Sequence, residues 1–163
     1  MTTSFPFKFV DLGTPLPFKI EANPDFPTET EPVCILNNLG DTGDDTFISL
    51  APNPDPWELT FRWATTGGAA IGTWQLDAFL QRIGPGPNLV VPGFPEDIGP
   101  GSVSPGRWDH VHAVVAPILP SLPPGVHLFR LYATLRWLAA GGSPLVKVAG
   151  RAEGPLIEFY KPV

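Results

Sequence analysis

Two tryptophan-bearing stretches decide the fold, Trp57-Glu58-Leu59-Thr60-Phe61-Arg62-Trp63 and Trp74-Gln75-Leu76-Asp77-Ala78-Phe79-Leu80-Gln81-Arg82-Ile83. In the first stretch every second side chain is large and apolar, which is the period of a strand with one buried face. The second stretch begins with the same alternation, although its later apolar residues also fit a helical stripe. We interpret both as strands that face each other across the break Thr65-Thr66-Gly67-Gly68, and we expect the first to supply hydrogen-bond partners for the second.

The composition favours an all-β protein. The chain has 163 residues, which is enough for one domain with a sizeable core. Its 22 prolines and 17 glycines leave few windows for an uninterrupted helix, whereas 43% hydrophobic residues argue against disorder. We therefore expect short strands joined by turns, with a strand or arm region over residues 1–30 and one domain over residues 31–163.

Residues 126–137 show the clearest two-faced pattern, with apolar side chains on one face and polar ones on the other. A helix over the same residues is the alternative. The Pro123-Pro124-Gly125 lead into this alternating strand resembles the penultimate strand of immunoglobulin-like and fibronectin-III-like sandwiches. The resemblance is one of pattern from about Pro32 onward, and the Cys-Trp-Cys framework of true immunoglobulin domains is missing. It implies an immunoglobulin-like or fibronectin-III-like β-sandwich with an N-terminal extended arm, and it implies no function.

Three phenylalanines, Phe5, Phe7 and Phe9, stand close together near the start of the chain. Pro6 restricts their segment to a sheet edge or an arm, because proline has no N–H to donate to a strand ladder. An apolar strand of this kind promotes aggregation when it is unpaired, so something must cover it. We predict that residues 4–10 lie along a sheet edge of a neighbouring subunit, and a first strand that covers the core of its own domain is the alternative.

Charge is unevenly divided along the chain. Residues 1–60 carry ten acidic groups and two basic ones, whereas residues 61–163 carry six acidic and eight basic groups. We expect the acidic first third of one copy to meet arginines of the next, with Arg130 and Arg136 as candidate interface residues. The net charge of −6 and the absence of a lysine and arginine cluster argue against nucleic acid as a partner.

Two histidines form the only pattern that suggests catalytic chemistry. Strand alternation places His110 and His112 on one face, close enough together to ligate one metal ion, and Asp109 on the other. The His-x-His pattern is similar to the first metal motif of cupins, but residues 114–119 lack the glutamate that follows there. The histidines are therefore weak metal candidates, and hydrogen-bonded strand histidines are the simpler interpretation.

A loop rich in oxygen ligands carries the second weak metal candidate, Asp41, Asp44 and Asp45. Carboxylates with glycine spacers suit calcium, although the order of an EF-hand loop is missing. Asn, Asp and Gly are also the ordinary residues of solvated turns. We expect no cofactor, with calcium as the alternative.

These observations predict a non-enzymatic structural or protein-interaction subunit that forms homo-oligomers or joins a larger protein assembly. One alternative is a small-molecule or glycan-binding module, which exposed tryptophans would favour. The other is a metal-dependent enzyme that uses His110 and His112. The sequence shows neither a secretion signal nor an apolar run of membrane-spanning length, and the lone Cys34 has no partner for an internal disulfide. We therefore expect a cytoplasmic protein without membrane insertion, and Cys34 as a core residue.

Overall fold

The computed structural model describes residues 2–11, 18–40, 46–49, 55–68, 72–98, 106–114, 122–139 and 146–162. Eleven strands and no helix are found in these residues, so the prediction of an all-β protein is confirmed, and no helix there is able to cross a membrane. The strands are β1 (Thr2–Asp11), β2 (Lys19–Glu21), β3 (Val33–Asn38), β4 (Phe47–Ser49), β5 (Trp57–Thr66), β6 (Gly72–Arg82), β7 (Leu89–Val90), β8 (Glu96–Ile98), β9 (Arg107–Val114), β10 (Gly125–Ala139) and β11 (Val146–Lys161).

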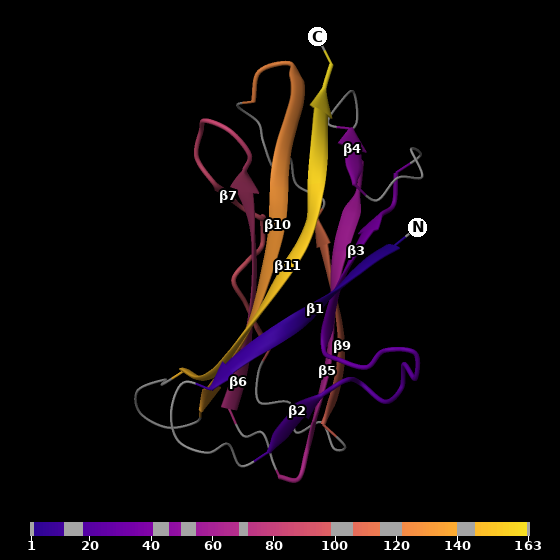
Figure 1. Cartoon of the computed structure of the whole chain (residues 1–163), viewed down its shortest axis with the longest axis vertical. Helices are drawn as coiled ribbons and strands as arrows, with labels where there is room; N and C mark the ends of the chain where they lie inside the picture. The colour runs from indigo at the N-terminus through magenta and orange to yellow at the C-terminus, as the bar shows by residue number, and fades with distance from the viewer. Residues whose placement is uncertain are drawn as a thin grey trace.

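The strands form one open, mainly antiparallel sheet with two halves. We call one of them the β5 half. In it, β5 pairs with β9 on one side and with β3 and β2 on the other. In the β10 half, β10 lies between β6 and β11, β6 also pairs with β7 and β8, and β4 pairs with β11 in parallel. In Figure 1, β6, β7 and β10 lie towards the left of the molecule, and β3, β5 and β9 lie towards the right.

Strand β1 joins the two halves, because its pairing changes at Pro6. Residues 2–6 pair with β3, and residues 7–11 pair with β11. Each part of β1 thus has one ladder partner, which suits a segment that contains proline. Both parts of this strand pair within their own chain, and Figure 1 shows β1 crossing over the molecule. Strand β2 also joins the same sheet, through β5.

Strands β5 and β6 do not pair with each other, contrary to the expectation that the first supplies hydrogen-bond partners for the second. They belong to different halves of the sheet and pack face to face instead. The ring centroids of Trp63 in β5 and Trp74 in β6 are 5.4 Å apart, and both side chains are fully buried. Trp108 of β9 stacks on Trp63 at 5.1 Å and lies 5.6 Å from Trp74. The apolar face of each strand therefore meets the opposite half of the sheet.

The long strands β10 and β11 form the centre of the β10 half. The predicted strand over residues 126–137 is confirmed, and its apolar side chains, among them Phe129 and Leu135, are buried. Strand β11 is continuous but contains an irregularity: Arg130 pairs with Leu156, whereas Tyr132 pairs with Glu153. Pro155 lies within this irregularity, where a ladder N–H is not required.

A short strand, β8, precedes β9 in the chain and pairs with residues 74–76 of β6. Its three residues, Glu-Asp-Ile, carry two carboxylates, so neither hydrophobic alternation nor β-branched composition indicated a strand. Strand β8 lies beside β6 at the edge of the β10 half. This edge contacts β9 in the β5 half, as described below.

The tryptophan contact between the halves gives a test of this packing. Trp63→Ala or Trp74→Ala should lower the free energy of unfolding by about 3–5 kcal/mol, because either change empties a fully buried aromatic site. Chemical denaturation followed by circular dichroism measures the effect. Val90→Ala, at a side chain that is 62% exposed, is the control and should change stability by less than about 0.5 kcal/mol. Equal stability of all three variants would contradict the face-to-face arrangement.

Candidate functional site

His110 and His112 lie on the same face of β9, as their spacing predicts. Asp109 points the other way and contacts Arg62, with its Oδ1 3.0 Å from Arg62 Nε. Both histidines meet Glu96 of β8, which lies in the other half of the sheet. The three side chains form a contact that we call the Glu96 clasp, and it ties the outer strand β9 to the edge of the β10 half.

Each oxygen of Glu96 contacts one histidine. His110 Nε2 lies 2.9 Å from Oε1, and His112 Nδ1 lies 2.7 Å from Oε2. The other ring nitrogen of His112 lies 2.9 Å from the carbonyl oxygen of Pro92. A carboxylate and a carbonyl oxygen only accept hydrogen bonds, so each ring nitrogen of His112 faces an acceptor. The clasp is therefore a charge-assisted contact.

The surroundings of the clasp hold it in place and favour the ionised carboxylate. The ring of Phe94 stacks on His112 with centroids 3.8 Å apart. Partial burial tends to raise the pKa of Glu96, but hydrogen bonds and charge from His112 and His110 outweigh it and hold that pKa below its usual value. Glu96 is therefore ionised over a wider pH range than a glutamate with an unshifted pKa.

The clasp uses the ring nitrogens that a metal ion would need. No group of three or more His, Cys, Asp or Glu side chains suitable for a metal is found in the described residues. Glu96 supplies the carboxylate that residues 114–119 lack, but it accepts hydrogen bonds from both histidines. Asp41, Asp44 and Asp45, the calcium candidates, lie outside the described residues.

The candidate interface phenylalanines lie inside the molecule. Phe5 and Phe7 are buried, and Phe9 packs against the same core. The rings of Phe7 and Phe61 are stacked 6.0 Å apart, so β1 fills the space at the side of the two halves. These side chains contribute to the protein's own core, and their contact with a neighbouring subunit stays a prediction.

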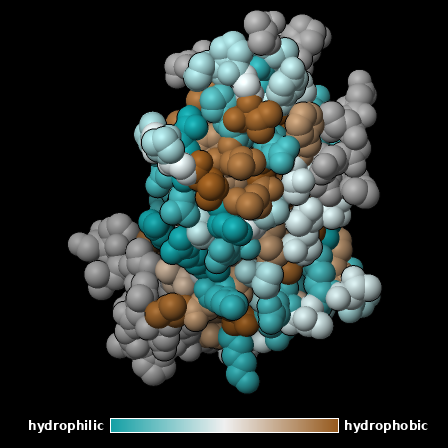
Figure 2. Space-filling view, turned by 45° about the horizontal axis from the view of Figure 1, so that its top comes forward, coloured by the Kyte–Doolittle hydropathy of each residue, from teal (hydrophilic) through white to brown (hydrophobic). Residues whose placement is uncertain are grey.

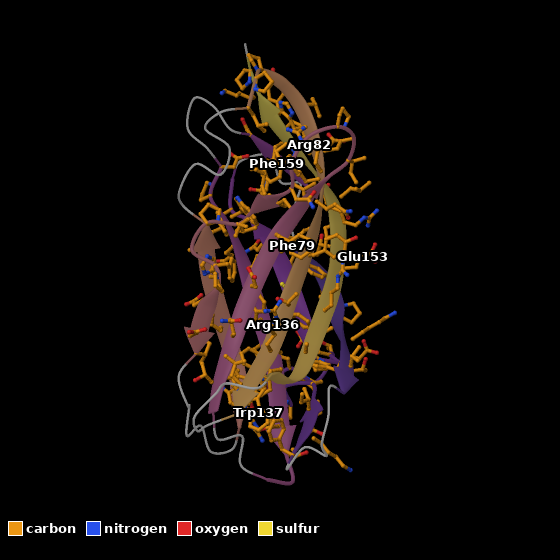
Figure 3. The ribbon with its side chains drawn as sticks, turned by 90° about the vertical axis from the view of Figure 1, so that its left-hand side faces the viewer. Phe79, Arg82, Arg136, Trp137, Glu153 and Phe159 are labelled. Carbon is orange, nitrogen blue, oxygen red and sulfur yellow. The ribbon has the colours of Figure 1, made fainter. Side chains whose placement is uncertain are left out.

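The two candidate arginines lie on the outer face of the β10 half, but only one of them has an ionic partner. Arg130 Nη1 lies 3.5 Å from Glu153 Oε1 and 3.3 Å from the carbonyl oxygen of Gly154. Arg136 has no ion pair with any described residue. Figure 3 shows Arg136 near the middle of this face, below Phe79.

Apolar side chains gather on the same outer face, nearer the end that carries the C-terminus. Cross-strand pairing places Val126 opposite Tyr160, and the backbone N–H of Ile83 donates to Leu128 O. Figure 2 shows hydrophobic side chains grouped on the surface with hydrophilic ones around them. We call this group the outer apolar patch, and its members are Ile83, Val126, Leu128, Leu156 and Tyr160.

The five tryptophans are all buried, so none forms an exposed platform for a sugar ring. Cys34 is fully buried too, as expected, and burial raises the pKa of its thiol well above the usual value. A thiol in that state is a poor nucleophile. Among the described residues, the polar groups that remain candidates for binding are therefore those of the Glu96 clasp and of the outer surface.

The clasp predicts a pH-dependent contribution to stability. Glu96→Gln should lower the free energy of unfolding at pH 7 by about 1–3 kcal/mol, because the variant removes a charge that two histidines contact. A carboxylate whose folded pKa is depressed stabilises the protein above its unfolded pKa, near 4.5, and loses this effect as the pH falls through the folded value. Urea denaturation at pH 7 and pH 3 should thus show a difference between wild type and variant that shrinks at the lower pH.

Asp97→Asn is the matched control, because Asp97 is the next residue and contacts Gln75 at the exposed surface, at 3.2 Å. It should change stability by less than about 0.5 kcal/mol. Equal effects of the two substitutions, or a difference between Glu96→Gln and wild type that is constant with pH, would contradict the clasp.

Comparisons with known proteins add nothing to these surfaces, since no family model, curated protein or solved structure matches the chain. Two features of the outer face of the β10 half are candidate binding surfaces. One is the outer apolar patch, and the other is the group of basic residues around Arg136.

Proposed function

We propose that this chain is a non-enzymatic interaction subunit that self-associates through the outer apolar patch. The observation that carries the proposal is the exposure of four large apolar side chains on β10, on β11 and at the residue that follows β6. Val126 is 56% exposed, Ile83 46%, Leu156 42% and Tyr160 37%. Isolated apolar residues are normal on a protein surface, but a contiguous group rimmed by polar side chains is typical of an interaction site.

A second copy of the chain is the partner that suits this patch. Glu158 lies within it, opposite Leu128, and forms no ion pair with a described residue. Arg130 lies beside it, opposite Leu156. A two-fold dimer brings the same patch of both copies together, so a surface that holds one acidic and one basic group is able to pair with itself. Glu158 of one copy would then meet Arg130 of the other.

The remaining features of the proposal follow from the fold. We infer that the two packed halves serve as a sandwich of the immunoglobulin-like or fibronectin-III-like kind, in which a broad sheet face carries the interaction. The proposal includes a cytoplasmic location and a role without catalysis. Support for the latter comes from the clasp, because Glu96, His110 and His112 are engaged with one another and not with an open cavity.

The test is the mass of the protein in solution. Sedimentation velocity over a range of concentrations should show a species of twice the 17.5 kDa chain mass. Leu156→Asp should raise the dimer dissociation constant by at least about 100-fold, because it buries an unpaired charge in an apolar contact. Val111→Asp is the control: Val111 is 50% exposed on β9, in the other half of the sheet, and its variant should dimerise normally.

Either of two results would overturn the proposal. One is a full-length protein that remains monomeric at every concentration up to the millimolar range. The other is a Leu156→Asp variant that keeps its fold by circular dichroism and dimerises as tightly as the Val111→Asp control.

A further inference from the structure

A hollow of about 430 Å³ opens on the outer face of the β10 half, away from the outer apolar patch. Strands β1, β11, β10 and β6 lie side by side here. The register places Val10, Ala149 and Arg136 in one row across β1, β11 and β10. Because Ala149 is small and its neighbours in the row are large, the row is low at its centre. The hollow therefore follows directly from the sequence of β11.

Three cationic side chains line the hollow, and none of its other lining residues among those that the structure describes carries a carboxylate. They are Lys8, Arg136 and Arg151. Lys8 stands directly opposite Arg151 in the β1–β11 pair, an arrangement in which like charges repel. None of the three forms an ion pair with a described residue. A bound anion would relieve this repulsion.

The nearest acidic group by register does not neutralise these charges. Asp77 of β6 stands opposite Thr134 of β10, but it does not line the hollow. Its Oδ1 accepts a hydrogen bond from the backbone N–H of Ala78 at 2.8 Å. Glu153, on β11, is engaged with Arg130. The hollow thus keeps a local excess of positive charge on a chain whose net charge is −6.

Two further groups give the hollow chemical selectivity. Thr134 Oγ1 is buried and has no hydrogen-bond partner among the described residues, so its hydroxyl is able to bond to a ligand in the hollow that it lines. The guanidinium carbon of Arg151 lies 4.3 Å from the centroid of the Tyr132 ring, which restricts the arginine's position. Phe79 stacks on Tyr132 at 5.1 Å and adds an apolar wall.

We propose that this hollow binds a phosphate or sulfate monoester. Lys8, Arg136 and Arg151 surround the oxyanion, and the Thr134 hydroxyl donates a hydrogen bond to it. The planar arginine side chains suit a tetrahedral oxyanion because each is able to donate two parallel hydrogen bonds. Phe79 and Val10 contact the organic group of the ester. This site is independent of the self-association proposed above, since the two use different residues of the face.

Titration calorimetry with phenyl phosphate, phenyl sulfate, inorganic phosphate and phenol tests the site, at ionic strength held constant with sodium chloride. The two esters should bind with one ligand per chain, inorganic phosphate more weakly, and phenol not at all. Ala149→Met fills the hollow without changing a charge, and Arg136→Gln removes one cation. Each should weaken phenyl phosphate binding by at least about tenfold.

Arg107→Gln is the charge-matched control, because Arg107 lies on β9 and pairs with Asp25 at 2.7 Å. Its affinity for phenyl phosphate should stay within about twofold of wild type. Thermal unfolding of each variant verifies that it is folded. If an arginine substitution destabilises the sheet, Ala149→Met still tests the site.

Three results would overturn the proposal. The first is no binding of either ester at millimolar concentration. The second is equal affinity of the wild type, Ala149→Met and Arg136→Gln proteins for phenyl phosphate. The third is equal affinity of the wild type for inorganic phosphate and phenyl phosphate, which would remove the role of the apolar wall. Failure of the dimer test leaves each of these results unchanged.

Discussion

The contact among Trp63, Trp74 and Trp108 is the interaction on which the rest of the structure depends. It is the place where the apolar faces of the two halves meet, with ring centroids 5.1 to 5.6 Å apart. A buried tryptophan removes roughly 150–250 Å² from water, which stabilises the fold by on the order of 4–6 kcal/mol before entropy costs. This contact holds β5 of one half against β6 of the other, so it also sets the separation between the two halves.

Different interactions join the two halves at the two sides of the molecule: main-chain hydrogen bonds on one side and side-chain contacts on the other. On one side, β1 exchanges main-chain hydrogen bonds first with β3 and then with β11. On the other, β9 and β8 meet through the side chains of His110, His112 and Glu96. A ladder of main-chain bonds distributes its stability over many residues, whereas the clasp concentrates it in one carboxylate. Local opening of the structure should therefore begin at the clasp.

Local pattern was sufficient to predict the long strands β5, β6 and β10 and the faces that they bury. Alternation identified β5, β6 and β10, and it placed His110 and His112 together, because side-chain direction in a strand depends only on neighbouring residues. Strand pairing was not predictable in the same way. The residues of β5 and β6 are close in sequence and adjacent in space, but they belong to opposite halves, since their apolar faces gain more from meeting each other than their edges do from pairing.

The clasp and the hollow were beyond prediction for the same reason. Glu96 reaches the histidines only because β8 pairs with β6 at the edge of the other half. Its one sequence signal is that Glu96 and Asp97 are the only carboxylates in the long loop before the histidines. Lys8, Thr134 and Arg151 come together through pairings between distant strands. No local period encodes that arrangement.

The pairing of β1 with β11 has a consequence for how the chain is made. Within the described residues, the ladder partner of residues 7–11 is residues 148–152, which are translated long after residues 7–11. At typical elongation rates the interval is on the order of 10 s. During it, only residues 2–6 of β1 are able to pair, with β3. A polypeptide that terminates before β11 exposes Phe7 and Phe9 on an unpaired strand, so incomplete chains of this protein should require chaperones or proteolysis far more than complete ones.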